Sequence, residues 1–296
     1  MSSLRVFSNR KKNCYSIPVD KGERILVRAS FYYGNYDGKS SPPVFDLQFD
    51  GNYWVTVNTS GSSSDVISHE VIYVVKEDST SICVAQTQPD QLPFISALEL
   101  RSLASTMYSH VTPNYAMHMI RRAAFGATQT IRYPVDAYDR IWQRAAGFGL
   151  TSVSNTAVTI KVTAEDNPPS AVLENAVTVA STSNYIILLT ALPDKPVPIY
   201  MAIYFSEVDV LDSTSRRSFQ VNVNDKPYSD IIIPPFGGVS EVYITNMSAS
   251  SKTSITVVPT SDSTLPPIVN AMEIYSLSGP LTSGTNSKDG TFLITS

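Results

Sequence analysis

The chain repeats part of its own sequence, and this repeat constrains the fold more than any other feature. Four blocks recur in the same order at a shift of about 172 to 174 residues. The matching blocks are Phe31–Tyr33 with Ile203–Phe205, Phe45–Asp50 with Phe219–Asn224, Thr80–Val84 with Thr253–Val257, and Ile95–Leu103 with Val269–Leu277. Four matches at nearly one shift predict that the 296 residues hold two copies of one domain.

Both copies consist of short segments in which apolar and polar residues alternate between turn-forming residues. A period of two, as in Ser218–Val223, indicates a strand with one buried face and one solvated face. The sequence therefore predicts an all-β fold of two tandem β-sandwich domains of the jelly-roll kind. Only Tyr115–Ala124 favours a helix. The predicted strands are Arg24–Tyr33, Val44–Phe49, Tyr53–Val57, Glu70–Val75, Ser81–Gln86, Ala157–Val162, Ala176–Ala180, Tyr185–Leu189, Ile199–Phe205, Ser218–Val223, Ser240–Thr245 and Thr253–Val258.

The shift between the copies also predicts where the domains begin and end. The second copy opens near Ile131–Asp136, and the corresponding point of the first copy would lie about 40 residues before Met1. We therefore expect a first domain at 1–110 that lacks its opening strands. An inter-domain connection at 111–130, a complete second domain at 131–278 and a flexible tail rich in Ser, Thr and Gly at 279–296 would follow.

Composition excludes several classes of function. The chain has three His, two Cys and a net charge of -4, so neither a metal site nor a nucleic-acid footprint is expected. Hydrophobic residues at 43% exclude a disordered chain, yet no apolar run is long enough for a transmembrane helix. The hydrolase, P-loop and dinucleotide signatures are missing, and we expect no cofactor and no enzyme activity. The first residues contain no export signal.

Several motifs resemble one family over most of the chain. They are Cys14–Tyr15, the block Arg28–Gly38, Phe45–Leu47, Pro93–Leu100, Arg132–Pro134 with Tyr138–Trp142, and Asn270–Ile274. Together they are similar to the plant malectin-like domain, a tandem of two malectin-type β-sandwich lobes found in leucine-rich-repeat receptor-like kinases and receptor-like proteins.

The resemblance implies a non-catalytic, extracellular module for ligand recognition. The family usually precedes leucine-rich repeats, a membrane helix and a kinase, and it is regarded as carbohydrate-binding because single-lobe malectin binds glucose disaccharides. The implied ligand is a cell-wall oligosaccharide or a secreted peptide, with a co-receptor as a further partner. The alternative is an adhesion or scaffold protein of the same fold without a kinase. The implied location is the outer face of the plasma membrane or the secreted space.

The candidate ligand-binding residues are Tyr32, Tyr33, Asn35, Tyr36 and Asp37. Aromatic rings beside planar polar groups suit sugar recognition, but the same Asn-x-Asp-Gly pattern is also ordinary turn chemistry. In the second copy, Phe205–Val208 resembles a malectin stretch that continues with an aromatic pair. Here Asp209 and Val210 follow, so that stacking pair is missing.

Other residues allow both a functional and a structural interpretation. Glu207 and Asp209 could be imagined as a glycosidase pair, although a solvated strand end suits them better. Trp54 and Trp142 are expected to be buried. If the chain is exported, Cys14 and Cys83 could form a disulfide, and otherwise they would be two buried thiols. The sequons at Asn58 and Asn246 become candidate glycan sites only with the family resemblance.

Overall fold

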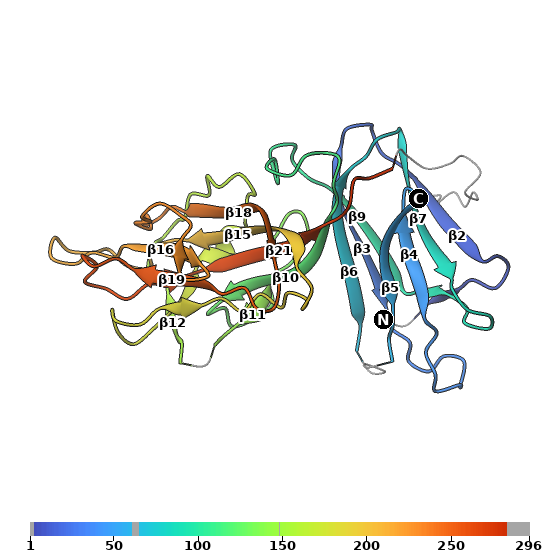
Figure 1. Cartoon of the computed structure of the whole chain (residues 1–296), viewed down its shortest axis with the longest axis horizontal. Coiled ribbons are helices and arrows are strands. Elements are labelled where there is room, and N and C mark those ends of the chain that lie inside the picture. Colours follow the sequence, from blue (N-terminus) through green and yellow to red (C-terminus); the bar gives the residue numbers. More distant parts are fainter. Residues whose placement is uncertain (1–2, 61–64, 148, 283–296) are drawn as a thin grey trace. The chain divides into compact units, whose positions relative to one another are not determined.

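The computed structural model describes residues 3–60, 65–147 and 149–282, and these residues form two compact units. Unit 1 comprises 3–60, 65–105, 112–118 and 278–282, and unit 2 comprises 106–111, 119–147 and 149–277. Nearly all regular structure is β, as predicted (Figure 1). The only helix among the described residues is the short 3-10 turn η1 (Ser170–Leu173), so none of the described helical structure could span a membrane.

Unit 1 is a sandwich of two antiparallel sheets. One sheet has the order β6-β3-β9, and β6 also pairs with the first residues of β10 (Met117–Phe125). The other sheet has the order β2-β7-β4-β5. Phe31, Phe45, Phe49 and Phe94 are fully buried in the core. Its strands are β1 (Arg5–Val6), β2 (Lys12–Pro18), β3 (Arg24–Phe31), β4 (Phe45–Phe49), β5 (Asn52–Val57), β6 (Ile67–Val74), β7 (Ser79–Gln86), β8 (Phe94–Ile95) and β9 (Ala97–Ser102).

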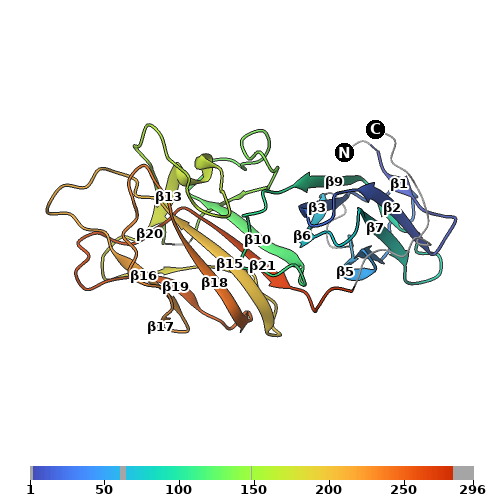
Figure 2. The same ribbon diagram turned by 90° about the horizontal axis from the view of Figure 1, so that it is seen from above.

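Unit 2 is a second sandwich with the same pairing scheme. Figure 2 shows β18, β15, β21 and β10 side by side, and the facing sheet has the order β14-β19-β16-β17. Three further strands form a small sheet in the order β12-β13-β20. The strands are β10 (Met117–Phe125), β11 (Gln143–Ala145), β12 (Thr151–Ser154), β13 (Asn175–Thr178), β14 (Ile186–Ile187), β15 (Val197–Phe205), β16 (Phe219–Val223), β17 (Lys226–Pro227), β18 (Ser240–Ala249), β19 (Ile255–Pro259), β20 (Ile268–Val269) and β21 (Ala271–Leu277).

The strand pairings follow the sequence repeat. In unit 1, β3 pairs with β6 and β9, and in unit 2 the matching strand β15 pairs with β18 and β21. Likewise β4 pairs with β7, as β16 pairs with β19. The described part of unit 1 has no counterpart of β10, β11 or β12, and β9 pairs there only with β3.

Three local predictions were wrong or incomplete. The helix predicted at Tyr115–Ala124 is the strand β10, because its residues join a sheet. The strand predicted at Ala157–Val162 has no regular structure and is largely exposed. Of the predicted tail, 283–296 lie outside the described residues, but Leu281 packs against the core of unit 1 and its N–H donates to the Asn114 carbonyl at 2.8 Å.

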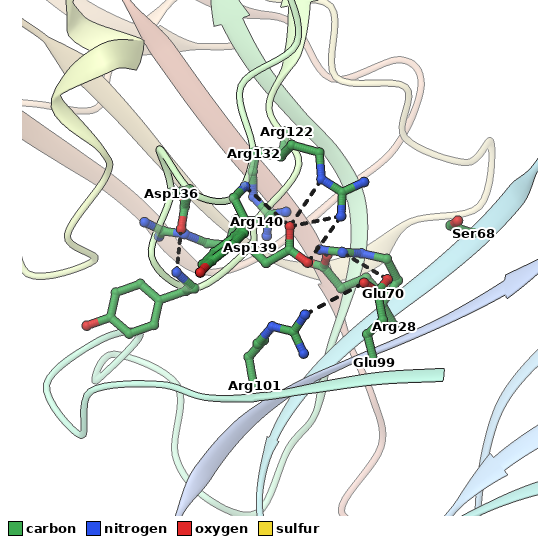
Figure 3. Close-up of polar contacts among 12 residues, drawn as sticks. Arg28, Ser68, Glu70, Glu99, Arg101, Arg122, Arg132, Asp136, Asp139 and Arg140 are labelled. Atoms are coloured by element: carbon green, nitrogen blue, oxygen red, sulfur yellow. Dashed lines mark hydrogen bonds and ion pairs between the residues drawn. The ribbon is translucent and has the colours of Figure 1, made fainter. Parts of the chain in front are cut away.

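A buried ionic cluster ties four parts of unit 2 together. Glu273 of β21 is fully buried and accepts a hydrogen bond from Arg122 Nε of β10 at 2.7 Å. Arg140 is also fully buried (Figure 3). Its Nη1 lies 3.5 Å from Glu273 Oε1, and its Nε lies 2.9 Å from Asp136 Oδ2. The Tyr204 hydroxyl of β15 donates to the same carboxylate at 3.0 Å. Although burial opposes ionisation, the two arginines hold the pKa of Glu273 below its usual range.

The matching glutamate of unit 1 is held differently. Glu99 of β9 accepts a hydrogen bond from Arg28 of β3 at 3.2 Å, and Arg28 also donates to Glu70 of β6 at 3.2 Å (Figure 3). Arg28 lies opposite Glu99 across the strand pair, whereas Ala202 lies opposite Glu273. The second copy therefore takes its cations from β10 and from the segment around Arg140.

Replacing Glu273→Gln should destabilise unit 2 by about 3–5 kcal/mol, because the buried Arg122 would lose the carboxylate that pairs with its Nε and Arg140 would lose one of its two carboxylate partners. Urea unfolding in a Trp54→Phe background measures this effect, since Trp142 in unit 2 then supplies the fluorescence. The matched control is Glu99→Gln, whose side chain is 26% exposed and which should cost clearly less. Equal losses in the two variants would contradict the assignment.

Cys14 and Cys83 lie directly opposite each other in β2 and β7 and form a disulfide with an S–S distance of 2.12 Å. The bond closes a loop with a sequence separation of 69 residues. Replacing both with Ala should lower the free energy of unfolding of unit 1 by roughly 2–5 kcal/mol. Dithiothreitol should lower the melting temperature of the unchanged chain and leave the double variant unaffected. A reductant effect of the same size on both proteins would refute this account.

Candidate functional site

The loop after β3 carries the five predicted ligand-binding residues, and most of their polar groups hold the loop itself. The Tyr33 hydroxyl, which is buried, donates to Asp37 Oδ1 at 2.5 Å and to Asn35 Oδ1 at 3.3 Å. Asn35 Oδ1 also accepts a hydrogen bond from the Ser40 N–H at 2.8 Å. Gly34 has a positive φ of 52°, and a Cβ there would lie only 2.8 Å from the Tyr32 ring. The block is thus a tightly bonded turn.

Two of these five residues line a surface depression. Tyr36 and Asp37 lie at a depression of about 190 Å³ whose lining also includes Lys39 and Asp90. The Tyr36 ring, which is 37% exposed, packs 5.5 Å from the Phe94 ring. The hydrogen bond from Tyr33 lowers the pKa of Asp37, so the carboxylate is charged at neutral pH. Cavities that hold small-molecule ligands usually measure about 300–1,000 Å³, so this depression suits one polar group.

Glu207 and Asp209 are each held by hydrogen bonds within unit 2. The prediction of a solvated strand end was wrong for Glu207, which is 2% exposed and accepts a hydrogen bond from Arg217 Nε at 2.8 Å. Asp209 accepts hydrogen bonds from the Thr156 hydroxyl at 3.1 Å and from the Val210 N–H at 2.8 Å. Both carboxylates are therefore held by structural contacts. Val210, at the place of the missing aromatic pair, is 70% exposed.

Unit 2 contains an apolar pocket that the sequence analysis did not identify. Its volume is about 440 Å³, within the range of ligand-binding cavities. Tyr185, Ile187 and Leu189 line it at alternate positions and are 53%, 55% and 64% exposed. The described residues of the lining carry no charge; the others are Gly147, Gly149, Leu150, Val179 and Asn184. The continuous apolar run at 185–189 could have indicated an exposed apolar surface, because a strand with one solvated face should have polar residues at alternate positions.

Two carboxylates of unit 2 with raised pKa values, Asp166 and Glu241, are packed among tyrosines. Asp166 is fully buried and accepts hydrogen bonds from the Tyr108 N–H at 2.6 Å and from the Tyr200 hydroxyl. Burial and the charge of Glu273 raise its pKa to about 7. Burial and the charge of Asp166 raise the pKa of Glu241 to about 8.

The surroundings of Glu241 are mainly aromatic. The Tyr243 hydroxyl donates to Glu241 Oε2 at 2.5 Å, and the His110 ring lies over the Tyr243 ring with centroids 4.2 Å apart. Neither Asp166 nor Glu241 lines the apolar pocket or the depression beside Tyr36. Within the described ranges, no group of His, Cys, Asp and Glu could hold a metal ion.

The remaining predicted positions lie as follows. Asn58 and Asn246 are both exposed, and Asn58 Oδ1 accepts hydrogen bonds from the Ser60 N–H and hydroxyl at 2.9 and 2.6 Å. Trp54 and Trp142 are 5% and 0% exposed, which confirms their expected burial.

Comparisons with known proteins agree with this architecture. The family described as the malectin-like domain matches residues 1–277. The chain is 37% identical over 292 residues to the Arabidopsis thaliana protein At1g24485, covering 97% of the chain and 58% of the relative. It is 35% identical over 299 residues to the probable LRR receptor-like serine/threonine-protein kinase At1g05700 of the same plant, covering 98% and 34%. The chain thus spans only part of these relatives.

A solved structure has the same fold. The crystal structure of the plant peptide RALF23 in complex with FER and LLG2 contains a chain that matches with a TM-score of 0.73. The match has 17% sequence identity and covers 97% of this chain and 84% of that one. At this identity the likeness concerns the fold, and it agrees with the prediction of tandem malectin-like β-sandwiches.

Unit 2 should lose stability as the pH rises. Asp166 and Glu241 have raised pKa values in the folded state, so between about pH 4.5 and pH 8 the folded chain binds more protons than the unfolded chain. Its melting temperature, followed by circular dichroism, should fall by several degrees over that interval. Glu241→Gln should flatten the slope, whereas Asp225→Asn, at an exposed carboxylate of the same unit, should leave it unchanged. A slope that survives Glu241→Gln intact would exclude this origin.

Proposed function

The chain belongs to the malectin-like domain family, and from this premise we propose that it is a non-catalytic, extracellular recognition module of a receptor-like protein that binds a secreted peptide. The apolar pocket of unit 2 carries the proposal. It offers a concave surface whose described lining is uncharged, with three exposed apolar side chains in and directly beside the edge strand β14. A peptide that places an aliphatic or aromatic side chain there would remove this surface from water.

Two further features support an extracellular location. The disulfide between Cys14 and Cys83 is a bond that persists in oxidising compartments, and both sequons present an exposed asparagine. The relatives include probable receptor-like kinases, of which a malectin-like region would form the ectodomain.

The partners of the module follow from the same comparison. The solved complex contains a peptide and a further protein, LLG2, beside the receptor FER. We propose a co-receptor as a second partner of this chain too, with signalling performed by a kinase or another protein. Catalysis by the chain itself has little support, because Glu207 and Asp209 are held by structural contacts.

A second contact area is proposed at the loop after β3. Tyr36 presents a partly exposed ring, and Asp37 presents a charged carboxylate beside Lys39. These two residues suit contact with one polar group of a ligand. Tyr32, Tyr33 and Asn35 would act there by holding the loop in shape.

The peptide proposal can be tested with a phage-displayed library of short linear peptides selected on the folded chain. Selected peptides should share an apolar residue, and Ile187→Asp should weaken their binding by roughly ten- to a hundredfold, as loss of one buried aliphatic contact predicts.

Ile231→Asp is the matched control, because Ile231 is 56% exposed on the same unit but does not line the pocket. It should leave affinity unchanged. Failure to select any peptide, or equal losses in both variants, would rule out the pocket as the peptide site.

A further inference from the structure

One edge of β9 has no neighbouring strand among the residues that the structure describes. On its other edge β9 pairs with β3 without a register shift, and the Leu103 N–H that follows it donates to the Arg24 carbonyl at 2.9 Å. Alternate residues of an antiparallel pair direct their backbone groups to the partner strand. Counted back from Leu103, the N–H and C=O groups of Leu98, Leu100 and Ser102 therefore face the open edge.

The equivalent edge in the second copy is covered, which shows what the open edge of β9 leaves accessible. β21, the counterpart of β9, pairs with β15 on one side and with β10 on the other. Met272 and Ile274 of β21 are fully buried there. Their counterparts Leu98 and Leu100 pack against the core of unit 1 but remain partly exposed. A further strand beside β9 would therefore remove apolar surface from water.

Other edge strands have features that oppose the addition of a strand. Prolines, bulges and covering side chains are common protections of this kind. β2 ends in Pro18, and the pairing of β5 with β4 contains a register shift. β18 also has a register shift, and the Tyr228 hydroxyl bonds to both the N–H and the carbonyl of its Thr245 at 3.2 and 3.1 Å. β9 contains no proline and pairs with β3 in a regular register.

The charges of β9 are complementary to those of a second, antiparallel copy of the same strand. When Leu100 lies opposite Leu100 of the second copy, the outward backbone groups of the two strands face each other and can form main-chain hydrogen bonds. In this register Glu99 of each strand lies directly opposite Arg101 of the other, and such pairs stabilise a sheet. A shift by two residues would place Glu99 opposite Glu99 or Arg101 opposite Arg101, so the charges select one register.

The present contacts of Glu99 and Arg101 allow this exchange of partners. Their side chains are 26% and 38% exposed, and Arg101 Nη2 lies 3.7 Å from Glu99 Oε1 of the same strand (Figure 3). Arg101 Nη1 also donates to the outward carbonyl of Leu100 at 2.9 Å. Pairing would replace this neutral acceptor by a carboxylate of the second copy, which forms a stronger hydrogen bond. The Leu100 carbonyl would then be available to the N–H of the second strand.

We propose that β9 is a self-association surface, through which two copies of this chain pair edge to edge and join their β6-β3-β9 sheets. The contact is two-fold symmetric, so each copy contributes the same residues to it. The inference goes beyond the proposed recognition role and does not depend on the identity of any ligand. A dimer would carry two recognition modules and would bind a bivalent partner more tightly than one module does.

Sedimentation equilibrium of the full chain at about 1–200 µM tests the proposal, because a contact made by one short strand is small and its dimer should form in this range. We expect monomers to convert reversibly to dimers as the concentration rises. Arg101→Glu would place carboxylates opposite each other in both symmetric pairs, so it should weaken association about tenfold or more. Glu99→Arg should have the same effect with two guanidinium groups.

An equimolar mixture of the two variants distinguishes this contact from a general loss of structure. Every facing pair of the mixed dimer would again have opposite charges, so the mixture should associate within about threefold of the unchanged chain although neither variant does so alone. Lys226→Glu, a charge reversal in the exposed edge strand β17, is the control and should leave association unchanged. Circular dichroism melts establish that each variant is folded. If Glu99→Arg fails to fold, the half-exposed Arg101 decides through Arg101→Glu alone.

Three results would overturn the self-association surface. They are a chain that stays monomeric over the whole range, an Arg101→Glu variant that associates as tightly as the unchanged chain, and a mixture that associates no better than its folded components. A synthetic peptide with the sequence of β10 tests the other occupant, a strand from elsewhere. Its binding to a chain that stays monomeric would show that the edge accepts a different strand and not a second copy. Peptide selection on Arg101→Glu should be unaffected, so failure of the recognition role is measured separately.

Discussion

The structure of unit 2 depends on one buried carboxylate. Glu273 lies at the centre of the sheet, and its ion pairs and hydrogen bonds reach β10, β15 and the segment around Arg140. A buried charge is costly unless it is fully compensated, so each of these parts has to occupy its place for the others to be stable. Arg140 also donates a hydrogen bond to Asp136, and this bond helps to hold the loop that contains Tyr133. The ionic cluster therefore also holds the loop between Arg132 and Arg140.

Much of the fold could be predicted from the sequence because the repeat carries topological information. The matches of β3 with β15 and of β9 with β21 predicted equivalent strands, and the pairings agree. The local sequence pattern gave wrong predictions at positions whose structure is determined by long-range contacts. Ala and Arg favour a helix at Tyr115–Ala124, but pairing with β21 makes that segment a strand. Glu207 is buried by Arg217, a contact that spacing alone does not reveal.

The candidate sites were less predictable than the fold. The block Tyr32–Asp37 has the composition of a binding site, yet composition does not tell whether polar groups bond to a ligand or to each other. Here they bond largely to each other. The apolar pocket of unit 2 combines the apolar run at 185–189 with Gly147, Leu150 and Val179, which become its neighbours only in the fold. Recognition surfaces of this kind depend on loops, which a strand pattern does not describe.

The two copies stabilise equivalent positions by different chemistry. At one such position the first copy has the bridged pair Cys14 and Cys83, whereas the second has Ile187 opposite Thr256. At a second pair of equivalent positions, Arg28 lies opposite Glu99 and forms an ion pair with it. Ala202 lies opposite Glu273, so the ion pairs of Glu273 are formed by Arg122 and Arg140 instead. Each of the two repeated lobes is therefore stabilised by its own kind of contact, a disulfide in unit 1 and a buried ionic cluster in unit 2. A chain made of two copies of unit 2 would therefore keep the ionic cluster in both lobes and contain no disulfide, whereas two copies of unit 1 would carry two disulfides and no such cluster.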